Sequence, residues 1–171
     1  MLLFAHPTGV SLAVGFLIAA LGESIRFWGV SYAGSETRTT GRVGGTKLVT
    51  SGPYAHVRNP LYLGNILLYA GVGVMSNALE PYLQIGAVIY FWFQYSAIVT
   101  LEEEYLAGTF SEWNDYQRSV PRFIPRLSSY TSGSTLMPDN SRALRSERSS
   151  LLAFGSITCI LIVMSFFRGP H

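Results

Sequence analysis

The sequence predicts an all-α integral membrane protein with about four transmembrane helices, a central antiparallel hairpin and a cytoplasmic amphipathic helical arm. Two observations carry this prediction. Of the 171 residues, 49% are hydrophobic and only 13% are charged, whereas about a quarter of the residues of a soluble domain are charged. In addition, four long stretches contain no Asp, Glu, Lys or Arg, namely residues 1–22, 61–79, 81–101 and 151–167.

The first apolar stretch is also long enough to be a secretory signal peptide. However, the first 25 residues contain no Lys or Arg, and cleaved signals begin with a basic region. We therefore expect a retained transmembrane helix. Gly15, Gly22 and Gly29 recur every seven residues along it, which predicts a stripe of small residues that another helix can approach closely.

The second and third stretches are separated by Glu80 alone. At about 1.5 Å of rise per residue, each spans roughly 28 to 31 Å, which is the thickness of the hydrocarbon core of a bilayer. Because the connection is so short, the two helices must be antiparallel. We therefore expect Pro60, at the start of one helix, and Leu101, at the end of the other, to emerge at nearly the same depth.

After the third stretch, apolar side chains recur at intervals of three or four residues, which predicts an amphipathic arm on the membrane surface. These side chains are Tyr105, Leu106, Phe110, Trp113 and Tyr116. Residues 127–150 are rich in Ser, Thr and Arg without an apolar pattern, which predicts a flexible cytoplasmic linker before a C-terminal helix at 151–167. We expect one membrane-embedded domain over residues 1–171, with its core motifs in 46–125.

The basic residues indicate the orientation in the membrane. All of the 12 Lys and Arg residues except Arg168 lie between the first and second stretches or between the third and fourth. Short basic loops stay in the cytoplasm, so both termini are expected on the non-cytoplasmic side. The formal net charge of +2 is too small to indicate a partner nucleic acid. The single cysteine, Cys159, excludes a disulfide framework or a cysteine-based metal site within one chain.

The predicted hairpin gathers polar side chains at one depth on the cytoplasmic face. These are Lys47, Tyr54, His56, Arg58, Asn59, Tyr62, Glu102, Glu103 and Glu104. Taken singly, charged and aromatic residues at the end of a transmembrane helix form a solvated boundary and an aromatic belt. Taken together, a cation at a helix start and carboxylates opposite it would hold a zwitterionic ligand.

Each group suits one part of such a ligand. Pro60 at the first turn leaves the following backbone amides directed at an anion. Glu102 can accept hydrogen bonds from an ammonium or from ribose hydroxyls, and tyrosine rings can face a cation. A molecule with a carboxylate, an ammonium, a ribose and a permanent cationic centre is S-adenosylmethionine.

Two segments carry a family resemblance. "KLVTSGPYAHVRNPLYLGN", from Lys47, and "EEEYLAGTFSEWNDYQRSVPRFIP", from Glu102, resemble the isoprenylcysteine carboxyl methyltransferase and phospholipid methyltransferase superfamily of integral membrane methyltransferases. The resemblance covers roughly residues 47–125. It implies S-adenosylmethionine as the cofactor, a lipophilic or small apolar methyl acceptor at the membrane interface, and no metal.

The resemblance also implies site residues. Cofactor contacts are expected from Thr46, Lys47, Leu48, Val49, Tyr54, Asn59, Pro60, Leu61, Tyr62 and Glu102. The residues expected at the reaction itself are Arg58, Asn59 and Glu103. For an acceptor amine, the candidates to take the proton are Glu103, Glu104 and His56.

The chain departs from the family pattern at two positions. Asn59 stands where the family has histidine, so an imidazole cannot act there, although an amide can still hydrogen-bond a carboxylate or adenine. Ile98 stands where the isoprenylcysteine branch has an arginine related to its substrate. The second departure weakens the case for a prenylcysteine carboxylate as the acceptor.

Two alternatives stay open at this point. An NADPH-dependent membrane reductase of the sterol reductase type has a similar helical architecture, but its cofactor carries an additional phosphate and usually needs more basic residues than Arg58 and Lys47. A non-catalytic membrane scaffold, in which Asn59 marks a lost activity, would bind neither cofactor.

Overall fold

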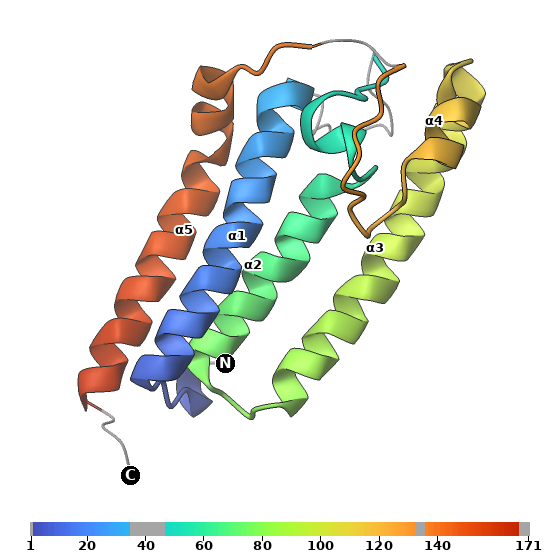
Figure 1. Ribbon diagram of the computed structural model, residues 1–171. Helices are drawn as coiled ribbons and strands as arrows, with labels where there is room; N and C mark the ends of the chain where they lie inside the picture. The colour runs from blue at the N-terminus through green and yellow to red at the C-terminus, as the bar shows by residue number, and fades with distance from the viewer. Residues whose placement is uncertain (1, 35–46, 133–135, 168–171) are drawn as a thin grey trace. The chain divides into compact units, whose positions relative to one another are not determined.

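The computed structural model describes residues 2–34, 47–132 and 136–167, and these residues form helices and connections without a β-strand (Figure 1). The predicted all-α class is therefore confirmed. The helices are η1 (Leu2–Phe4), α1 (Gly9–Ala33), η3 (Gly52–Ala55), α2 (Pro60–Ser76), α3 (Tyr82–Thr109), α4 (Trp113–Ser119) and α5 (Asn140–Phe167).

Three of these helices, α1, α3 and α5, are long and apolar enough to cross a membrane. The remaining predicted span, at residues 61–79, corresponds to α2, which is apolar but has only 17 residues and ends at Ser76. It is shorter than the apolar stretch because Asn77 and Leu79 have φ angles of 48° and 51°, in the left-handed region that ends a helix. The chain is thus a membrane protein with three clear candidate spans and one shorter apolar helix.

The chain divides into two compact units, each built from parts of the long helices. The first unit comprises Met1–Ser24, Gly64–Phe93 and Arg148–His171, and the second comprises Ile25–Leu63 and Gln94–Glu147. All of the candidate site residues that the structure describes belong to the second unit.

In the first unit, α1 begins with a reciprocal cap. The Thr8 backbone N–H donates to Ser11 Oγ at 2.9 Å, and the Ser11 N–H donates to Thr8 Oγ1 at 3.1 Å. This arrangement satisfies two of the backbone donors that a helix start leaves without intrahelical partners. The local sequence therefore defines where the apolar helix starts.

The predicted stripe of small residues on α1 packs against α2. An ideal Cβ on Gly22 would lie 2.6 Å from the Gly64 carbonyl oxygen and 2.6 Å from the Leu68 nitrogen. Such distances leave no room for a side chain, so the two backbones approach closely at this point. Within the second unit, Gly29 contacts Leu61 in the same way, with its Cβ position 2.7 Å from Leu61 Cδ2.

The connection between α2 and α3 makes the predicted hairpin. Within the first unit, Gln84 Nε2 of α3 donates to the Gly73 carbonyl of α2 at 3.2 Å, and the rings of Tyr69 and Phe91 stack 4.8 Å apart. These contacts join residues at increasing distance from the turn on both helices. The antiparallel arrangement is confirmed.

The C-terminal helix starts earlier than its apolar stretch predicts. α5 begins at Asn140, within the region expected to be a linker, and Asp139 caps it by accepting from the Arg142 N–H at 2.9 Å. Within the second unit, Glu147 is completely buried and forms an ion pair with Arg26 at 2.6 Å. The sequence before residue 151 shows no apolar periodicity because a carboxylate, that of Glu147, occupies a buried position of this helix.

The amphipathic arm is broken rather than continuous. α3 ends at Thr109 and α4 begins at Trp113, with Phe110 between them. The arm's apolar residues form a cluster in which Trp113, Tyr116 and Val120 are buried. The 3.6-residue pattern thus identified the buried Trp113 and Tyr116, but it also included Tyr105, which is exposed, and it missed the break.

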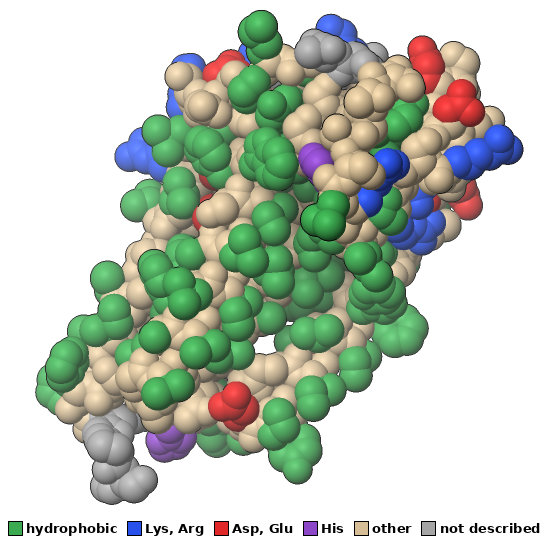
Figure 2. Space-filling model, viewed as in Figure 1, with side chains coloured by type: hydrophobic (Ala, Val, Ile, Leu, Met, Phe, Trp, Pro, Cys, Tyr) green, Lys and Arg blue, Asp and Glu red, His purple; other side chains and the backbone are tan. Residues whose placement is uncertain are grey.

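Hydrophobic side chains cover much of the surface seen in Figure 2. In the first unit, exposed large side chains include Leu17 and Phe93, which are 69% and 72% accessible. In the second unit, Lys and Arg side chains gather near α4 (Figure 2). An apolar exterior of this kind suits contact with lipid.

Candidate functional site

The candidate site is built where α2 begins and α3 nears its end. The Tyr62 hydroxyl donates to Glu102 Oε1 at 2.7 Å, and Arg58 Nη2 lies 3.4 Å from Glu103 Oε1. The Tyr62 ring also packs on Tyr95 of α3, with centroids 4.7 Å apart. The two sequence motifs are therefore side by side, as the hairpin predicts.

Arg58 is the most unusual side chain of the site. Its side chain is 10% exposed, and its Nε and Nη1 atoms are buried without a hydrogen-bond partner among the described residues. Its Cζ lies 5.7 Å from the centroid of the Trp113 ring, within the range of a cation–π contact. Burial lowers the pKa of Arg58, the Glu103 carboxylate opposes this, and Arg122 adds to it. A guanidinium stays charged in proteins, so this buried cation has two donors to offer.

Glu103 is committed to two arginines. Arg122 donates through Nε to Oε1 at 3.3 Å and through Nη2 to Oε2 at 2.5 Å, a two-point ion pair, while Arg58 approaches Oε1. The Glu103 side chain is 7% exposed. These contacts favour a positioning role for Glu103 over the predicted role as a proton acceptor.

Asn59 forms a contact that the sequence does not predict. Its Nδ2 donates to the Arg122 carbonyl oxygen at 3.2 Å, so the amide that replaces the family's histidine holds a backbone segment in place. Pro60 is fully buried at the first position of α2, and the Leu63 N–H donates to the Asn59 carbonyl at 3.2 Å. Of the amides expected to be available at this helix start, that of Leu63 is already used.

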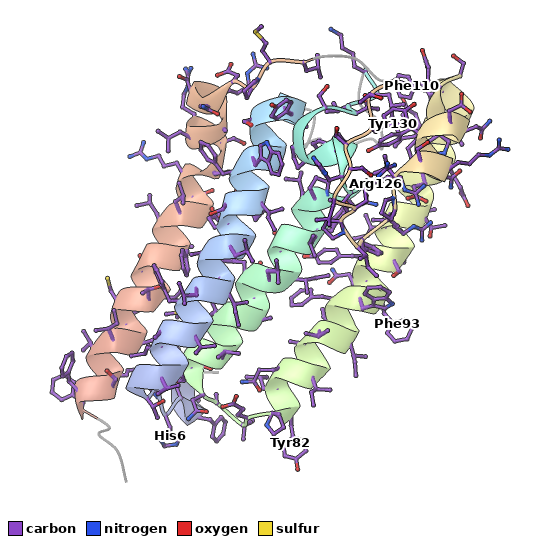
Figure 3. The ribbon with its side chains drawn as sticks, viewed as in Figure 1. His6, Tyr82, Phe93, Phe110, Arg126 and Tyr130 are labelled. Atoms are coloured by element: carbon purple, nitrogen blue, oxygen red, sulfur yellow. The ribbon has the colours of Figure 1, made fainter. Side chains whose placement is uncertain are left out.

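A segment after α4 fixes the residues before α2. We call residues 120–130 the post-α4 segment and residues 54–59 the pre-α2 segment; Figure 3 labels Arg126 and Tyr130 on the former. The backbone bonds between them are Arg58 N–H to Pro121 O at 2.9 Å, Arg126 N–H to His56 O at 3.0 Å and Tyr130 N–H to Ala55 O at 3.0 Å. The position of Arg58 thus depends on a segment more than 60 residues away in sequence.

Further contacts hold the same two segments. His56 Nδ1 lies 2.9 Å from the Arg126 carbonyl oxygen, and because a carbonyl only accepts, Nδ1 carries the proton. In the neutral ring, His56 Nε2 is then the acceptor. The buried Tyr116 hydroxyl donates to the Tyr54 carbonyl at 2.8 Å. Burial raises the pKa of both tyrosines. Glu102 raises the pKa of Tyr54 further, and Tyr54 raises that of Tyr116. Both hydroxyl groups therefore stay protonated.

The remaining predicted residues lie at different places. Leu48 packs against the cluster of Trp113, Tyr116 and Val120, Val49 is partly buried, and Lys47 is exposed. Glu104 is exposed on α3. Thr46 lies outside the described residues.

Sequence reasoning missed the part that Arg122 plays. The signal was present in the quoted segment, where this arginine stands between Pro121 and Pro125, but it was interpreted only as one of the basic residues that set orientation. Within the described residues, no group of three His, Cys, Asp or Glu side chains is placed to hold a metal ion.

The sequence pattern of the phospholipid methyltransferase family matches residues 10–112, which is more than half of the chain. The chain belongs to this family. The match includes the pre-α2 segment and the glutamates of α3, and it ends before α4.

Three curated proteins are similar to the chain. The cobalt-zinc-cadmium resistance protein CzcN of Cupriavidus metallidurans is 38% identical over 78% of this chain and 61% of its own length. The nickel-cobalt-cadmium resistance protein NccN of Alcaligenes xylosoxydans xylosoxydans is 35% identical over 74% of this chain and 55% of its own length. The protein-S-isoprenylcysteine O-methyltransferase of Schizosaccharomyces pombe is 32% identical over 67% of this chain and 49% of its own length. The chain thus spans about half to three fifths of the length of these relatives.

Proposed function

We propose that the protein is an S-adenosylmethionine-dependent membrane methyltransferase that acts on a lipophilic or small apolar acceptor at the membrane interface. One observation carries this proposal: the buried guanidinium of Arg58 has two donors without a partner among the described residues, beside the hydrogen-bonded pair of Tyr62 and Glu102. In a methyl donor with an amino-acid end and a ribose, the carboxylate would pair with Arg58, and the ammonium or the ribose hydroxyls would pair with Glu102. Membership of a family of methyltransferases supports the same conclusion.

The residues fit the cofactor in the following way. Arg58 would bind the carboxylate through Nε or Nη1, because a buried cation gains most from a charge-assisted hydrogen bond. Glu102 would accept from the ammonium or the ribose hydroxyls, and Tyr62 holds its carboxylate in one orientation. When bound, the cofactor supplies a methyl group on a positively charged sulfur, which an acceptor attacks in line.

The protein would then act mainly by position. Holding donor and acceptor in line and excluding water lowers the barrier by several kcal/mol. Glu103 keeps Arg58 in place, and the partly buried Tyr54 and the Tyr62 and Tyr95 rings shield the site from water. For an amine acceptor, Nε2 of His56 and the exposed Glu104 are the groups left to take a proton.

Orientation follows from charge. The site lies among most of the basic residues, so it would face the cytoplasm, where the cofactor is made, with both termini on the opposite side. An apolar acceptor would arrive from the lipid.

Titration calorimetry in detergent with S-adenosylhomocysteine tests the cofactor. The parent should bind, and Tyr62→Phe and Glu102→Gln should each weaken binding about tenfold, because each removes one hydrogen bond to a charged group. Glu104→Gln is the matched control: it removes the same charge two residues further along α3, at an exposed position, and it should bind as the parent does. Equal affinity in all four proteins would rule out this pocket.

Two further measurements separate the alternatives. Transfer of labelled methyl from S-adenosylmethionine to a membrane lipid extract, followed by identification of the product, would name the acceptor. Tight NADPH binding without binding of S-adenosylhomocysteine would instead indicate a reductase. Binding of neither would indicate a scaffold.

A further inference from the structure

The charges around Glu103 do not balance. One buried carboxylate lies between two guanidiniums, those of Arg58 and Arg122, so the three groups together carry one net positive charge. Burying an uncompensated charge costs several kcal/mol unless another group pairs with it. The Arg122 side chain is 35% exposed and partly solvated, whereas the Arg58 side chain is 10% exposed, so Arg58 is the cation that gains most from an added anion.

The distances show which arginine is free to receive that anion. Arg122 binds both oxygens of Glu103, at 3.3 and 2.5 Å, whereas Arg58 reaches Oε1 with one nitrogen at 3.4 Å. An arginine and a carboxylate prefer a two-point pair, and Glu103 has only one such face to offer. Because Arg122 occupies it, Nε and Nη1 of Arg58 keep their hydrogen atoms available.

We propose that Arg122 is a positioning residue that makes the site selective for ligands with a carboxylate, by engaging Glu103 and so keeping Arg58 from closing on it. This inference rests on the proposed function, because it takes the carboxylate to be that of the methyl donor. It adds a residue that lies beyond the stretch matched by the family pattern. The side chain and the backbone of Arg122 act together here, since its carbonyl oxygen is held by Asn59.

Loss of Arg122 should therefore affect only ligands that carry the carboxylate. Without the Arg122 charge, Arg58 would form the two-point pair with Glu103, and the incoming carboxylate would lose its partner. The affinity for a ligand without the carboxylate would stay the same. Removing Glu103 as well would free Arg58 again.

The test compares two ligands by titration calorimetry on the full chain in detergent. They are S-adenosylhomocysteine and its decarboxylated analogue, which keeps the amine, the thioether and the adenosine. Arg122→Gln should weaken binding of S-adenosylhomocysteine about tenfold or more, the loss of one charge-assisted contact, and leave the affinity for the analogue within about twofold. The double variant Arg122→Gln with Glu103→Gln should recover most of the preference for S-adenosylhomocysteine.

Arg118→Gln is the control, because Arg118 is an exposed arginine on α4 and its loss changes the net charge equally. It should leave both affinities unchanged. The inference is overturned if Arg122→Gln weakens both ligands to the same extent or neither of them, or if the double variant shows no recovery. Failure of the parent to bind S-adenosylhomocysteine would instead overturn the proposed function itself.

Discussion

Gly71 of α2 gives a sharp test of how closely the helices of the first unit pack (Figure 1). An ideal Cβ at Gly71 would lie 2.6 Å from the Gly15 carbonyl oxygen and 2.8 Å from Ala19 Cα. The Ala19 nitrogen would lie closer still. Ordinary contacts begin near 3.4 Å, so Gly71→Ala must move α1 and α2 apart by at least about 0.8 Å, a gap that forfeits roughly a quarter to a half of each dispersion contact across it. Overpacking against backbone atoms costs about 1 to 3 kcal/mol.

Gly73→Ala is the matched control for this prediction. Its Cβ would meet only the flexible Gln84 side chain, at an ordinary distance of 3.6 Å. Both changes replace glycine by alanine within the same helix, so the gain in helix propensity, about 1 kcal/mol, cancels in the difference. Unfolding in detergent, followed by tryptophan fluorescence, should show Gly71→Ala less stable than Gly73→Ala by about 1 to 3 kcal/mol. A Gly71→Ala variant as stable as the control would refute the backbone contact.

Three further outcomes follow from buried polar groups. Tyr116→Phe leaves the Tyr54 carbonyl without its donor and should lower the free energy of unfolding by about 1 to 3 kcal/mol, measured by the same assay. Burial raises the pKa of Tyr116 above its ordinary value of 10.0, so the unfolded chain releases this proton first; stability should be constant below about pH 10 and fall above it, less steeply in Tyr116→Phe. Arg26→Ala removes the guanidinium that pairs with the buried Glu147 carboxylate and should destabilise by about 3 to 5 kcal/mol, whereas replacing both residues by apolar ones of similar volume should recover most of the loss.

Much of the candidate site could be predicted from local patterns. The apolar stretches defined three long helices, and the short connection at Glu80 required the second and third helices to be antiparallel. That requirement alone brought Tyr62 beside Glu102, the contact seen at 2.7 Å. The small-residue stripe on α1 likewise predicted a close helix neighbour, although not that the neighbour is α2.

Other features could not be predicted because they depend on partners that are distant in sequence. The start of α5 at Asn140 was missed because a buried position of this helix holds Glu147, whose carboxylate pairs with Arg26 of α1. The hydrogen bond from the Asn59 amide to the Arg122 carbonyl could not be predicted either, because the two residues are 63 positions apart in the sequence.

The sequence by itself determined the class of protein, the family, and the pairing of the two motifs, since hydrophobicity, helix length and loop length are local properties. Only the tertiary structure decided which charges meet. The post-α4 segment, folded against the pre-α2 segment, pairs Glu103 with Arg122 and leaves Nε and Nη1 of Arg58 without a partner among the described residues. Side-chain electrostatics depend on distances of a few ångströms, and those are set by the packing of the whole unit rather than by spacing along the chain.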